Sequence, residues 1–278
     1  MIIDAVIVLY NPKDEFFNKF KEMSPYFHKL FFIDNSTNKE LNIKDKLAEI
    51  KNATYISLEG NQGIAKALNT GVNAAKEENP DYILTMDQDS IFPLDKMDDL
   101  TKILEANKDS KYCIISVNFN SEETTLEIRE EPWWITSGNF INVKALVATN
   151  IKFMDELFID GVDQEFCHSF MKAGYKIGVI PGISLKHQIG NPKVHRILWK
   201  KFSTFNYPYF RYYYLFRNYY YLYKTDKKFY KKEFRKIKYY QPFKIRMYEE
   251  DKKGKLRAAK LGKKDAKAGL LGPCQHEF

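Results

Sequence analysis

Short apolar runs alternate with stretches of helical period along the first 117 residues. The runs are rich in Ile, Val, Leu and Phe and predict strands at residues 2–9, 30–33, 54–58, 82–86 and 113–117. Between them, the spacing of apolar positions predicts helices at residues 13–23, 44–51, 64–78 and 96–107. This alternation is typical of βαβ units. It predicts an α/β fold with a mainly parallel sheet flanked by helices.

The remainder of the chain is less regular. A helix is expected at residues 164–173, followed by a strand at 175–180 and a turn at Pro181-Gly182. From about Val194 the composition changes to Tyr, Phe, Lys and Arg, with no internal repeat or low-complexity linker. We therefore expect an α/β domain at 1–190 and a helical, basic, tyrosine-rich region at 191–278 that packs on it.

Composition agrees with a folded chain. The 278 residues are 44% hydrophobic and 15% aromatic, enough to bury a large core. The three cysteines show no metal-site or disulfide spacing, which favours free thiols in a reducing compartment. The amino terminus lacks a basic leader region and no apolar run approaches the roughly 18 residues of a spanning helix, so neither a signal peptide nor a membrane span is predicted.

Charge is unevenly distributed along the chain. Residues 1–180 hold 19 Lys and Arg against 29 Asp and Glu, whereas residues 181–278 hold 25 against 7. A basic, aromatic tail on an acidic body suggests a polyanionic partner, either anionic lipid or nucleic acid. A solvated helical face rich in lysine explains the charge equally well.

The most informative segment is Tyr82-Ile-Leu-Thr-Met-Asp87-Gln-Asp89-Ser90. An apolar strand that ends in two acids places carboxylates at the carboxyl edge of a parallel sheet, where open α/β folds bind ligands. Such oxygen ligands suit Mg²⁺ or Mn²⁺, which can bridge the phosphates of a nucleotide sugar. An isolated Asp-x-Asp is more often a turn or a helix cap, so the strand-end position carries the interpretation.

Other predicted strands end in polar residues at the same edge. Tyr10 could lie flat against a base, Asp34 could accept a hydrogen bond from a ring N–H, and the turn containing Asn61 and Gly63 lets backbone approach a ligand. Lys66 falls in the first turn of the helix that follows, in reach of a phosphate or a base. A core tyrosine, an Asx turn, an ordinary loop and a solvated lysine are the structural alternatives.

Taken together, these segments resemble glycosyltransferase family 2, which has the GT-A, Rossmann-like fold, over roughly residues 1–190. The matching segments are VIVLYNP, IDNS, NQGIAKALNTG, MDQDS, TSGNF and GVDQEFCHSFMKAGYKIGVIPG. The resemblance implies that Tyr10 and Asp34 hold the base, that Lys66 and Asp87 assist nucleotide binding, and that Asp89 is the main metal ligand.

The resemblance also implies a catalytic base. Asp163, ahead of Ala173-Gly174-Tyr175, aligns with the residue that takes a proton from the acceptor hydroxyl, although Val162 replaces the acid that commonly precedes it. One base without a carboxylate nucleophile implies direct displacement with inversion. In similar enzymes a histidine near His187 approaches the metal or diphosphate, so His187 is assigned as a third ligand.

The acceptor side is expected near the Trp133-Trp134 pair and the Ser137-Gly138 turn. Aromatic faces pack well against the C–H faces of sugar rings, so Trp133, Trp134 and Ser137 are assigned to acceptor binding. Burial of a tryptophan in the core is the competing interpretation.

A narrower resemblance concerns the donor. MDQDS and the Arg211…Arg217-Asn218 pattern are similar to bacterial rhamnosyltransferases, which use dTDP-L-rhamnose. The resemblance implies transfer to a glycan or lipid-linked oligosaccharide in surface polysaccharide synthesis. Galactofuranosyl or glucosyl transfer stays open, because small pocket differences decide the sugar.

The tail suggests attachment to a membrane surface. Tyr213, Phe216, Tyr220 and Tyr223 recur at helical spacing, and residues 252–271 form a second basic element. Two such elements suit peripheral binding to the anionic cytoplasmic face of the cell membrane. A helical subdomain or a homodimer contact built from the same aromatics is the alternative.

Two other protein classes fit less well. A nucleotidyltransferase would carry a glycine-rich loop after the first strand, where Leu9-Tyr10-Asn11-Pro12 stands. A nucleic-acid-binding protein would explain the tail but not the acidic body, and no nucleic-acid motif is present. We therefore expect no nucleic-acid partner.

Overall fold

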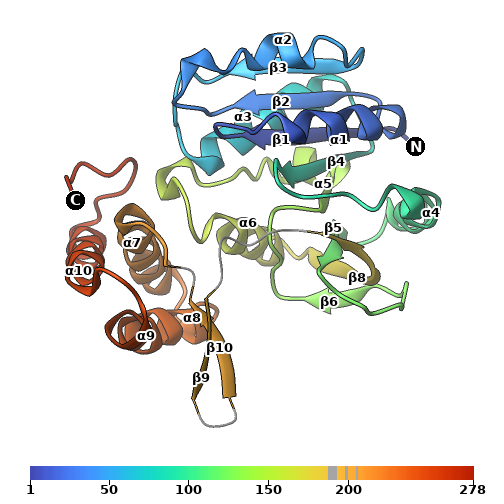
Figure 1. Cartoon of the computed structure of the whole chain (residues 1–278). Coiled ribbons are helices and arrows are strands. Elements are labelled where there is room, and N and C mark those ends of the chain that lie inside the picture. Colours follow the sequence, from blue (N-terminus) through green and yellow to red (C-terminus); the bar gives the residue numbers. More distant parts are fainter. Residues whose placement is uncertain (187–192, 198–199, 205) are drawn as a thin grey trace. The chain divides into compact units, whose positions relative to one another are not determined.

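The computed structural model describes residues 1–186, 193–197, 200–204 and 206–278. The chain divides into two compact units. An N-terminal unit holds Met1–Met154 and Asp163–His187, and a C-terminal unit holds Asp155–Val162 and Gln188–Phe278 (Figure 1). The domain boundary expected at residue 190 lies outside the described residues. That the short segment 155–162 joins the C-terminal unit was not expected.

An eight-stranded sheet in the order β3-β2-β1-β4-β7-β5-β8-β6 forms the centre of the N-terminal unit (Figure 1). Its strands are β1 (Ile3–Leu9), β2 (Leu30–Asp34), β3 (Ala53–Ser57), β4 (Tyr82–Asp87), β5 (Tyr112–Phe119), β6 (Arg129–Glu131), β7 (Asn139–Asn142) and β8 (Lys176–Leu185). Only the pairs that involve β7 or β6 are antiparallel among these strands. The predicted α/β architecture with a mainly parallel sheet is therefore confirmed.

The helices cover both faces of this sheet. They are α1 (Glu15–Met23), α2 (Ile43–Leu47), α3 (Ile64–Glu77), α4 (Met97–Asn107), α5 (Val143–Thr149) and α6 (Val162–Lys172). Alternate β1 residues, from Ile3 to Leu9, pack in one apolar cluster with α1, α2 and α4. The opposite face carries α3, where a Cβ at Gly71 would lie 2.3 Å from Val6 Cγ1. Only glycine lets α3 approach β1 so closely.

One predicted turn is wrong. Instead of ending at Pro181-Gly182, β8 continues to Leu185, with a register shift against β5 between Val117 and Asn118. A bulge absorbs the proline and keeps the strand paired. At Gly182 a Cβ would meet the backbone of Thr124 at 2.5 Å, so the glycine serves a close backbone approach and not a turn.

The C-terminal unit is mainly helical and also contains a pair of antiparallel strands that the sequence did not predict. Its strands and helices are β9 (Lys193–Ile197), β10 (Lys200–Thr204), α7 (Tyr209–Thr225), α8 (Lys231–Arg235), the π-helix Lys236–Tyr240, α9 (Gln241–Tyr248) and α10 (Lys252–Ala268). α7 packs along α10, and a Cβ at Gly262 would lie 2.2 Å from the carbonyl oxygen of Tyr213. Within the described part of the chain, no helix has the length and apolar character to span a membrane.

Packing between α7 and α10 changes the interpretation of the aromatic stripe expected to face a membrane, which begins with Tyr213 and Phe216. Tyr213 is 2% exposed and Phe216 is 0% exposed. Both lie in an apolar cluster with Ala258 and Ala259 of α10. Tyr213 and Phe216 therefore form the core of a helical subdomain, and they do not present a free face to a membrane.

Candidate functional site

Sheet register brings three candidate residues to one edge. Leu9, the last residue of β1, is level with Asp34 of β2, and Val8 is level with Asp87 of β4. Tyr10 follows β1 directly, so it stands between these two acids at the carboxyl ends of parallel strands. β1 pairs with β2 on one side and with β4 on the other, which makes this edge the point where the strand order reverses.

The middle residue of the Asp-x-Asp turn ties that turn to β1. Gln88 Oε1 accepts a hydrogen bond from the Tyr10 amide at 2.7 Å, and Gln88 Nε2 donates to the Tyr10 carbonyl at 3.0 Å. The Tyr10 ring stays exposed, at 45%. The turn therefore fixes the backbone of Tyr10 while leaving the ring available to stack on a base.

A buried serine anchors the other side of the Asp-x-Asp turn. Ser137 Oγ accepts from the Asp87 amide at 3.1 Å and lies 2.7 Å from Ser90 Oγ. Ser137 is 2% exposed. The structure thus gives Ser137 a part in shaping the turn, while the expected contact with an acceptor stays a prediction.

Lys19 is a neighbour of the acids that the sequence did not indicate. Its Nζ donates to the Ser90 carbonyl at 2.9 Å. Burial lowers the pKa of Lys19 to about 8, against the attraction of Asp89, which raises it. Lys19 is in α1, so a cation from a different element adds positive charge beside the Asp-x-Asp turn. A spacing pattern within one segment has no signal for such a pairing.

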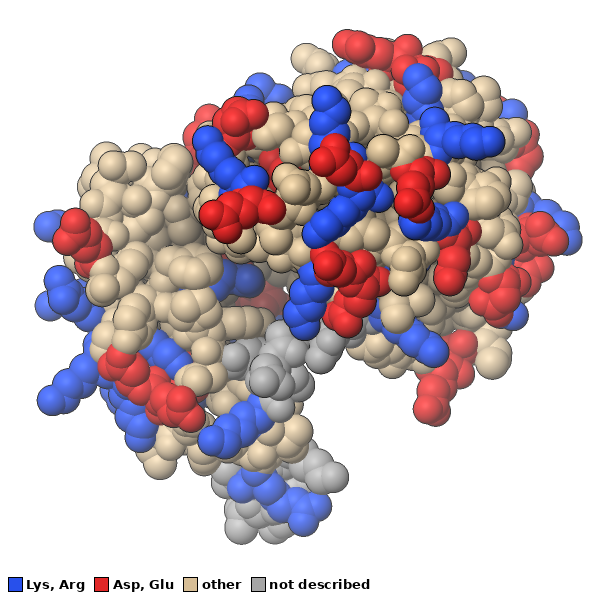
Figure 2. Space-filling model, turned by 45° about the horizontal axis from the view of Figure 1, so that its top comes forward, with Lys and Arg blue, Asp and Glu red and all other residues tan. Residues whose placement is uncertain are grey.

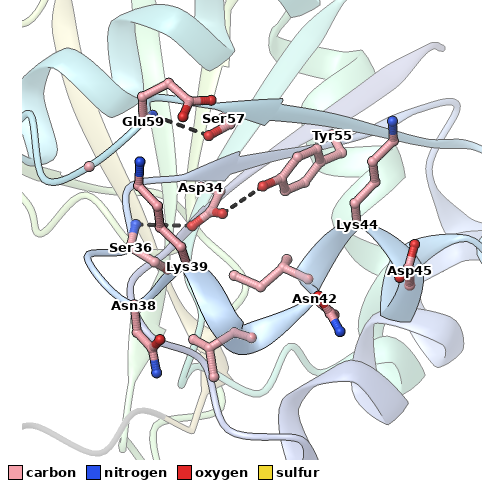
Figure 3. A pocket seen from close by; sticks show the side chains of 13 residues that line it. Asp34, Ser36, Asn38, Lys39, Asn42, Lys44, Asp45, Tyr55, Ser57 and Glu59 are labelled. Carbon is pink, nitrogen blue, oxygen red and sulfur yellow. Dashed lines mark hydrogen bonds between the residues drawn. The ribbon is translucent and has the colours of Figure 1, made fainter.

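A cavity of about 370 Å³ opens at Asp34 (Figure 3). Asp34 Oδ1 accepts from the Ser36 amide at 2.9 Å, and Asp34 Oδ2 accepts from the Tyr55 hydroxyl at 2.6 Å. Burial, with the adjacent Asp34 carboxylate, raises the pKa of Tyr55 to about 12, so Tyr55 remains a donor at neutral pH. Lys39 and Lys44 line the same cavity. The lone pairs that Asp34 retains can accept a ring N–H.

The glycine turn after β3 is built as expected. Asn61 Oδ1 accepts from the Gly63 amide at 3.0 Å and from Asn35 Nδ2 at 3.2 Å. Gly63 has φ +85°, a conformation that favours glycine, and α3 begins at the next residue. Lys66 lies exposed in the first turn of α3. Asn61, Gly63 and Lys66 therefore stand at the amino terminus of a helix that follows the same sheet edge.

Asp163 lies half-buried in the first turn of α6, where its Oδ1 accepts from the Gln164 amide at 2.9 Å. The Cys167 thiol, one turn further along α6, donates to the Trp134 carbonyl at 3.9 Å. Trp134 Nε1 donates to the Val117 carbonyl at 3.1 Å, and both Trp133 and Trp134 are half-buried. Trp134 is thus a neighbour of the helix that carries Asp163.

His187 lies outside the described residues, so its assignment as a ligand stays a prediction. Its neighbour Lys186 pairs with Ile91, two residues after Asp89, through hydrogen bonds of 2.8 and 3.0 Å. Among the described residues, no group of three or more His, Cys, Asp and Glu side chains forms a metal cluster. Two carboxylates still fit Mg²⁺ or Mn²⁺, because these ions take few protein ligands when phosphates supply the rest.

Comparison with known proteins agrees with this geometry. The sequence model of the family described as "Glycosyl transferase family 2" matches residues 14–158, more than half of the chain. The dTDP-rhamnosyl transferase RfbF of Shigella flexneri is 32% identical over 214 residues, covering 69% of this chain and 71% of the relative.

Two solved structures share the fold at low sequence identity. One is TarS 1–349 of S. aureus, with a TM-score of 0.51 and 17% identity over 68% of this chain. The other is GalNAc-T7 with UDP, GalNAc and Mn²⁺, with a TM-score of 0.59 and 13% identity over 97% of this chain. The chain spans 60% and 58% of the lengths of these two proteins. With the family match and the RfbF identity, the sheet edge at Tyr10, Asp34 and Asp87 leads to one conclusion: the chain belongs to glycosyltransferase family 2.

Proposed function

We propose that this protein is an inverting hexosyltransferase that moves L-rhamnose from dTDP-L-rhamnose to a hydroxyl of a glycan or lipid-linked oligosaccharide. The observation that carries the proposal is the convergence of Tyr10, Asp34, Asp87 and Asp89 at one sheet edge. The choice of donor rests on the 32% identity to a dTDP-rhamnosyl transferase. Galactofuranosyl or glucosyl transfer from another nucleotide sugar is the alternative.

The nucleoside end of the donor belongs at the Asp34 cavity. A volume of about 370 Å³ is in the range of small-ligand pockets. Asp34 would accept the thymine N–H, and the exposed Tyr10 ring would stack on the base. Lys66, at the start of α3, would meet a phosphate or the base, with the helix amino terminus adding positive potential.

The diphosphate belongs at the Asp-x-Asp turn. Asp89, assisted by Asp87, would hold Mg²⁺ or Mn²⁺, and His187 is a third ligand in this proposal. When bound, the cation would neutralise charge on the departing dTDP. Lys19 adds a positive charge from the protein itself beside Asp89.

The transfer step needs a base at the acceptor. Asp163 would take the proton of the attacking hydroxyl as the oxygen bonds to the anomeric carbon and the bond to the dTDP oxygen breaks. A single base on the acceptor side gives inversion. Trp133 and Trp134 would pack against the acceptor sugar, because Trp134 contacts the helix of Asp163.

A panel of nucleotide sugars tests this proposal. Purified protein with Mn²⁺ or Mg²⁺ is offered dTDP-rhamnose, UDP-glucose, UDP-galactofuranose and GDP-mannose, and release of nucleoside diphosphate is measured with and without a glycan acceptor mixture. Of the four donors, we expect only dTDP-rhamnose to release nucleoside diphosphate. EDTA should abolish this release. Preference for another donor would replace the rhamnosyl assignment. Release from none of the donors would refute the proposed glycosyltransferase activity.

We also propose that the C-terminal unit binds the anionic inner face of the cell membrane through α8, the turn before it and the π-helix Lys236–Tyr240 after it. A groove of about 600 Å³ is lined there by Lys228, Phe229, Lys231, Lys232, Arg235, Lys236, Tyr239 and Tyr240. Tyr239 is 62% exposed and Tyr240 is 46% exposed. Clustered cations beside exposed apolar side chains suit a headgroup interface. On the face that Figure 2 shows, the N-terminal unit instead carries Lys and Arg mixed with Asp and Glu.

Vesicle flotation tests the membrane proposal. The double variant Lys231→Glu, Arg235→Glu should lose binding to phosphatidylglycerol vesicles, whereas the matched control Lys253→Glu, Lys260→Glu, with the same charge change on α10, should keep most of it. Neither protein should bind phosphatidylcholine alone. Equal loss in both variants would indicate net charge only, and single-stranded DNA binding without vesicle binding would favour the nucleic-acid alternative.

A further inference from the structure

The segment Asp155–Val162, which runs directly into Asp163, has an unusual backbone. Phe158 has φ 66° and Asp160 has φ 64°, and Gly161 follows with φ 81°. Residues other than glycine rarely adopt this left-handed backbone conformation, which persists where surrounding contacts impose it. The segment belongs to the C-terminal unit, so the contacts that impose it come from there.

Asn218 of α7 binds three carbonyl groups of this backbone. Its Nδ2 donates to the carbonyl oxygens of Leu157 at 2.8 Å, Ile159 at 2.6 Å and Asp160 at 2.8 Å. Asn218 is 0% exposed. Because the donating amide is fully buried, its hydrogen bonds to three carbonyl groups specify the path of the chain.

Arg217, the preceding residue, completes the same network. Its Nη2 donates to the carbonyl oxygens of Glu156 and Leu157, each at 3.0 Å, and its Nη1 donates to the Gly272 carbonyl. Its Nε donates to Asn218 Oδ1 at 2.9 Å, which orients the amide. A buried guanidinium is costly unless hydrogen bonds satisfy it, and here all three nitrogens donate to carbonyl oxygens.

A third α7 residue contacts the segment from its more exposed side. Arg211 donates through Nε to Asp160 Oδ2 at 3.0 Å and through Nη2 to Asp160 Oδ1 at 2.7 Å. The Phe158 ring stacks on Tyr214, with ring centroids 4.9 Å apart. α7 therefore holds both the backbone and the side chains of residues 156–160, three residues before Asp163.

From these contacts we infer that Arg217, Asn218 and Arg211 are positioning residues for the transfer reaction. They set the backbone that enters α6, and through chain continuity they set the direction in which Asp163 is presented. The inference rests on the proposed role of Asp163 as the base. It gives the tyrosine-rich helix a part in catalysis that is separate from any membrane role.

Asn218→Ala tests the inference, because it removes the three hydrogen bonds to residues 157–160 and the one accepted from Arg217, and it adds no bulk. We expect kcat to fall about tenfold to hundredfold, since a base displaced by about 1 Å loses this much. The KM for the donor and the Kd for dTDP should stay within about twofold, because the nucleotide residues lie elsewhere. The control is Ile245→Ala, buried in the apolar cluster of the same unit, in α9.

Melting temperatures are measured for both variants, and kinetics are recorded well below the lower one. If Asn218 had only a structural role, Asn218→Ala and Ile245→Ala would have the same kcat whenever they lose the same amount of stability. If Asn218→Ala does not fold, Arg211→Lys, which keeps the charge but loses the two-point contact with Asp160, takes its place. Wild-type kcat in the folded variant, or an equal loss in Ile245→Ala, would overturn the inference.

Asp163→Asn separates this inference from the proposed function. Full activity of Asp163→Asn would remove the base, and the positioning role with it. An inactive Asp163→Asn together with an unimpaired Asn218→Ala would leave the base in place and reject only the positioning residues.

Discussion

The Gln88 side chain forms hydrogen bonds with both backbone groups of Tyr10. It accepts from the Tyr10 amide at 2.7 Å and donates to the Tyr10 carbonyl at 3.0 Å. The residue between the two acids therefore has its own function. It joins the turn after β4, proposed to hold the diphosphate, to Tyr10 after β1, proposed to stack on the base. Movement of the Asp-x-Asp turn would carry Tyr10 with it.

Gln88→Ala should raise the KM for the donor about tenfold, because two hydrogen bonds of about 0.5–1.5 kcal/mol each hold the Tyr10 backbone. The change in kcat should be smaller, since the acceptor side is untouched. Gln88→Glu should be at least as impaired, because a carboxylate would face the Tyr10 carbonyl. Steady-state kinetics at saturating acceptor measure both, and an unchanged KM in Gln88→Ala would show that the pair is dispensable.

Asp89→Ala should abolish the stimulation of donor binding by Mn²⁺, because it removes the carboxylate proposed as the main ligand. The control is Asp95→Ala, an exposed acid six residues further along, in the short 3-10 helix Leu94–Lys96. Titration of dTDP by calorimetry, with Mn²⁺ and with EDTA, gives the readout. If Asp89→Ala binds dTDP as tightly as the wild type does in Mn²⁺, the metal is held elsewhere.

Tyr55→Phe should weaken dTDP binding about threefold to tenfold. The lost hydroxyl donates to Asp34 Oδ2 at 2.6 Å, and of the hydrogen bonds described for this carboxylate the one from the Ser36 amide remains (Figure 3). Tyr26→Phe, at a tyrosine that is 47% exposed, is the matched control. Fluorescence or calorimetric titration distinguishes them. Equal affinities would place the base away from the Asp34 cavity.

Asp163→Asn should lower kcat by at least about a hundredfold while leaving the Kd for dTDP nearly unchanged, because general-base catalysis contributes about 10²–10⁴-fold. Asp98→Asn serves as the control, since Asp98 also lies in the first turn of a helix, α4. Donor consumption in the presence of acceptor is the measurement. Activity equal to that of the control would assign the base to another residue.

Asp4→Asn should change how stability depends on pH. Asp4 is 0% exposed, and its Oδ1 accepts from the Lys29 amide at 2.9 Å and lies 3.0 Å from His28 Nδ1. Burial raises the pKa of Asp4 above its usual 3.8, against the opposing effect of His28. Between 3.8 and the raised pKa the native state binds more protons than the unfolded state, so the free energy of unfolding falls as pH rises through this window.

Urea denaturation at closely spaced pH values from 3.5 upward measures this effect. The Asp4→Asn protein should show a flatter decline through the window, because the amide does not titrate. Asp45→Asn, at an exposed position, should follow the wild type. Parallel curves for all three proteins would mean that Asp4 does not contribute to the pH dependence.

Hydrophobic periodicity in the sequence was enough to predict most of the strands and helices of the N-terminal unit, because this periodicity depends on residues that are close together in the chain. Strand β4 was expected at residues 82–86 and spans Tyr82–Asp87, and α3 was expected at 64–78 and spans Ile64–Glu77. In a parallel sheet the carboxyl ends of strands lie at one edge, so the placement of Tyr10, Asp34 and Asp87 at one edge was predictable from where the strands end. That β1 lies between β2 and β4, which makes the three residues neighbours, came from the structure.

Tertiary structure decided which face each ambiguous segment presents and which distant side chains meet. The stripe of Tyr213 and Phe216 has the same spacing whether it faces a membrane or a partner helix, and only α10 settles that it is buried. Gln88 meets Tyr10, and Asn218 meets Leu157, across 78 and 61 residues of chain. Such pairs leave no local pattern, because each depends on how whole elements pack.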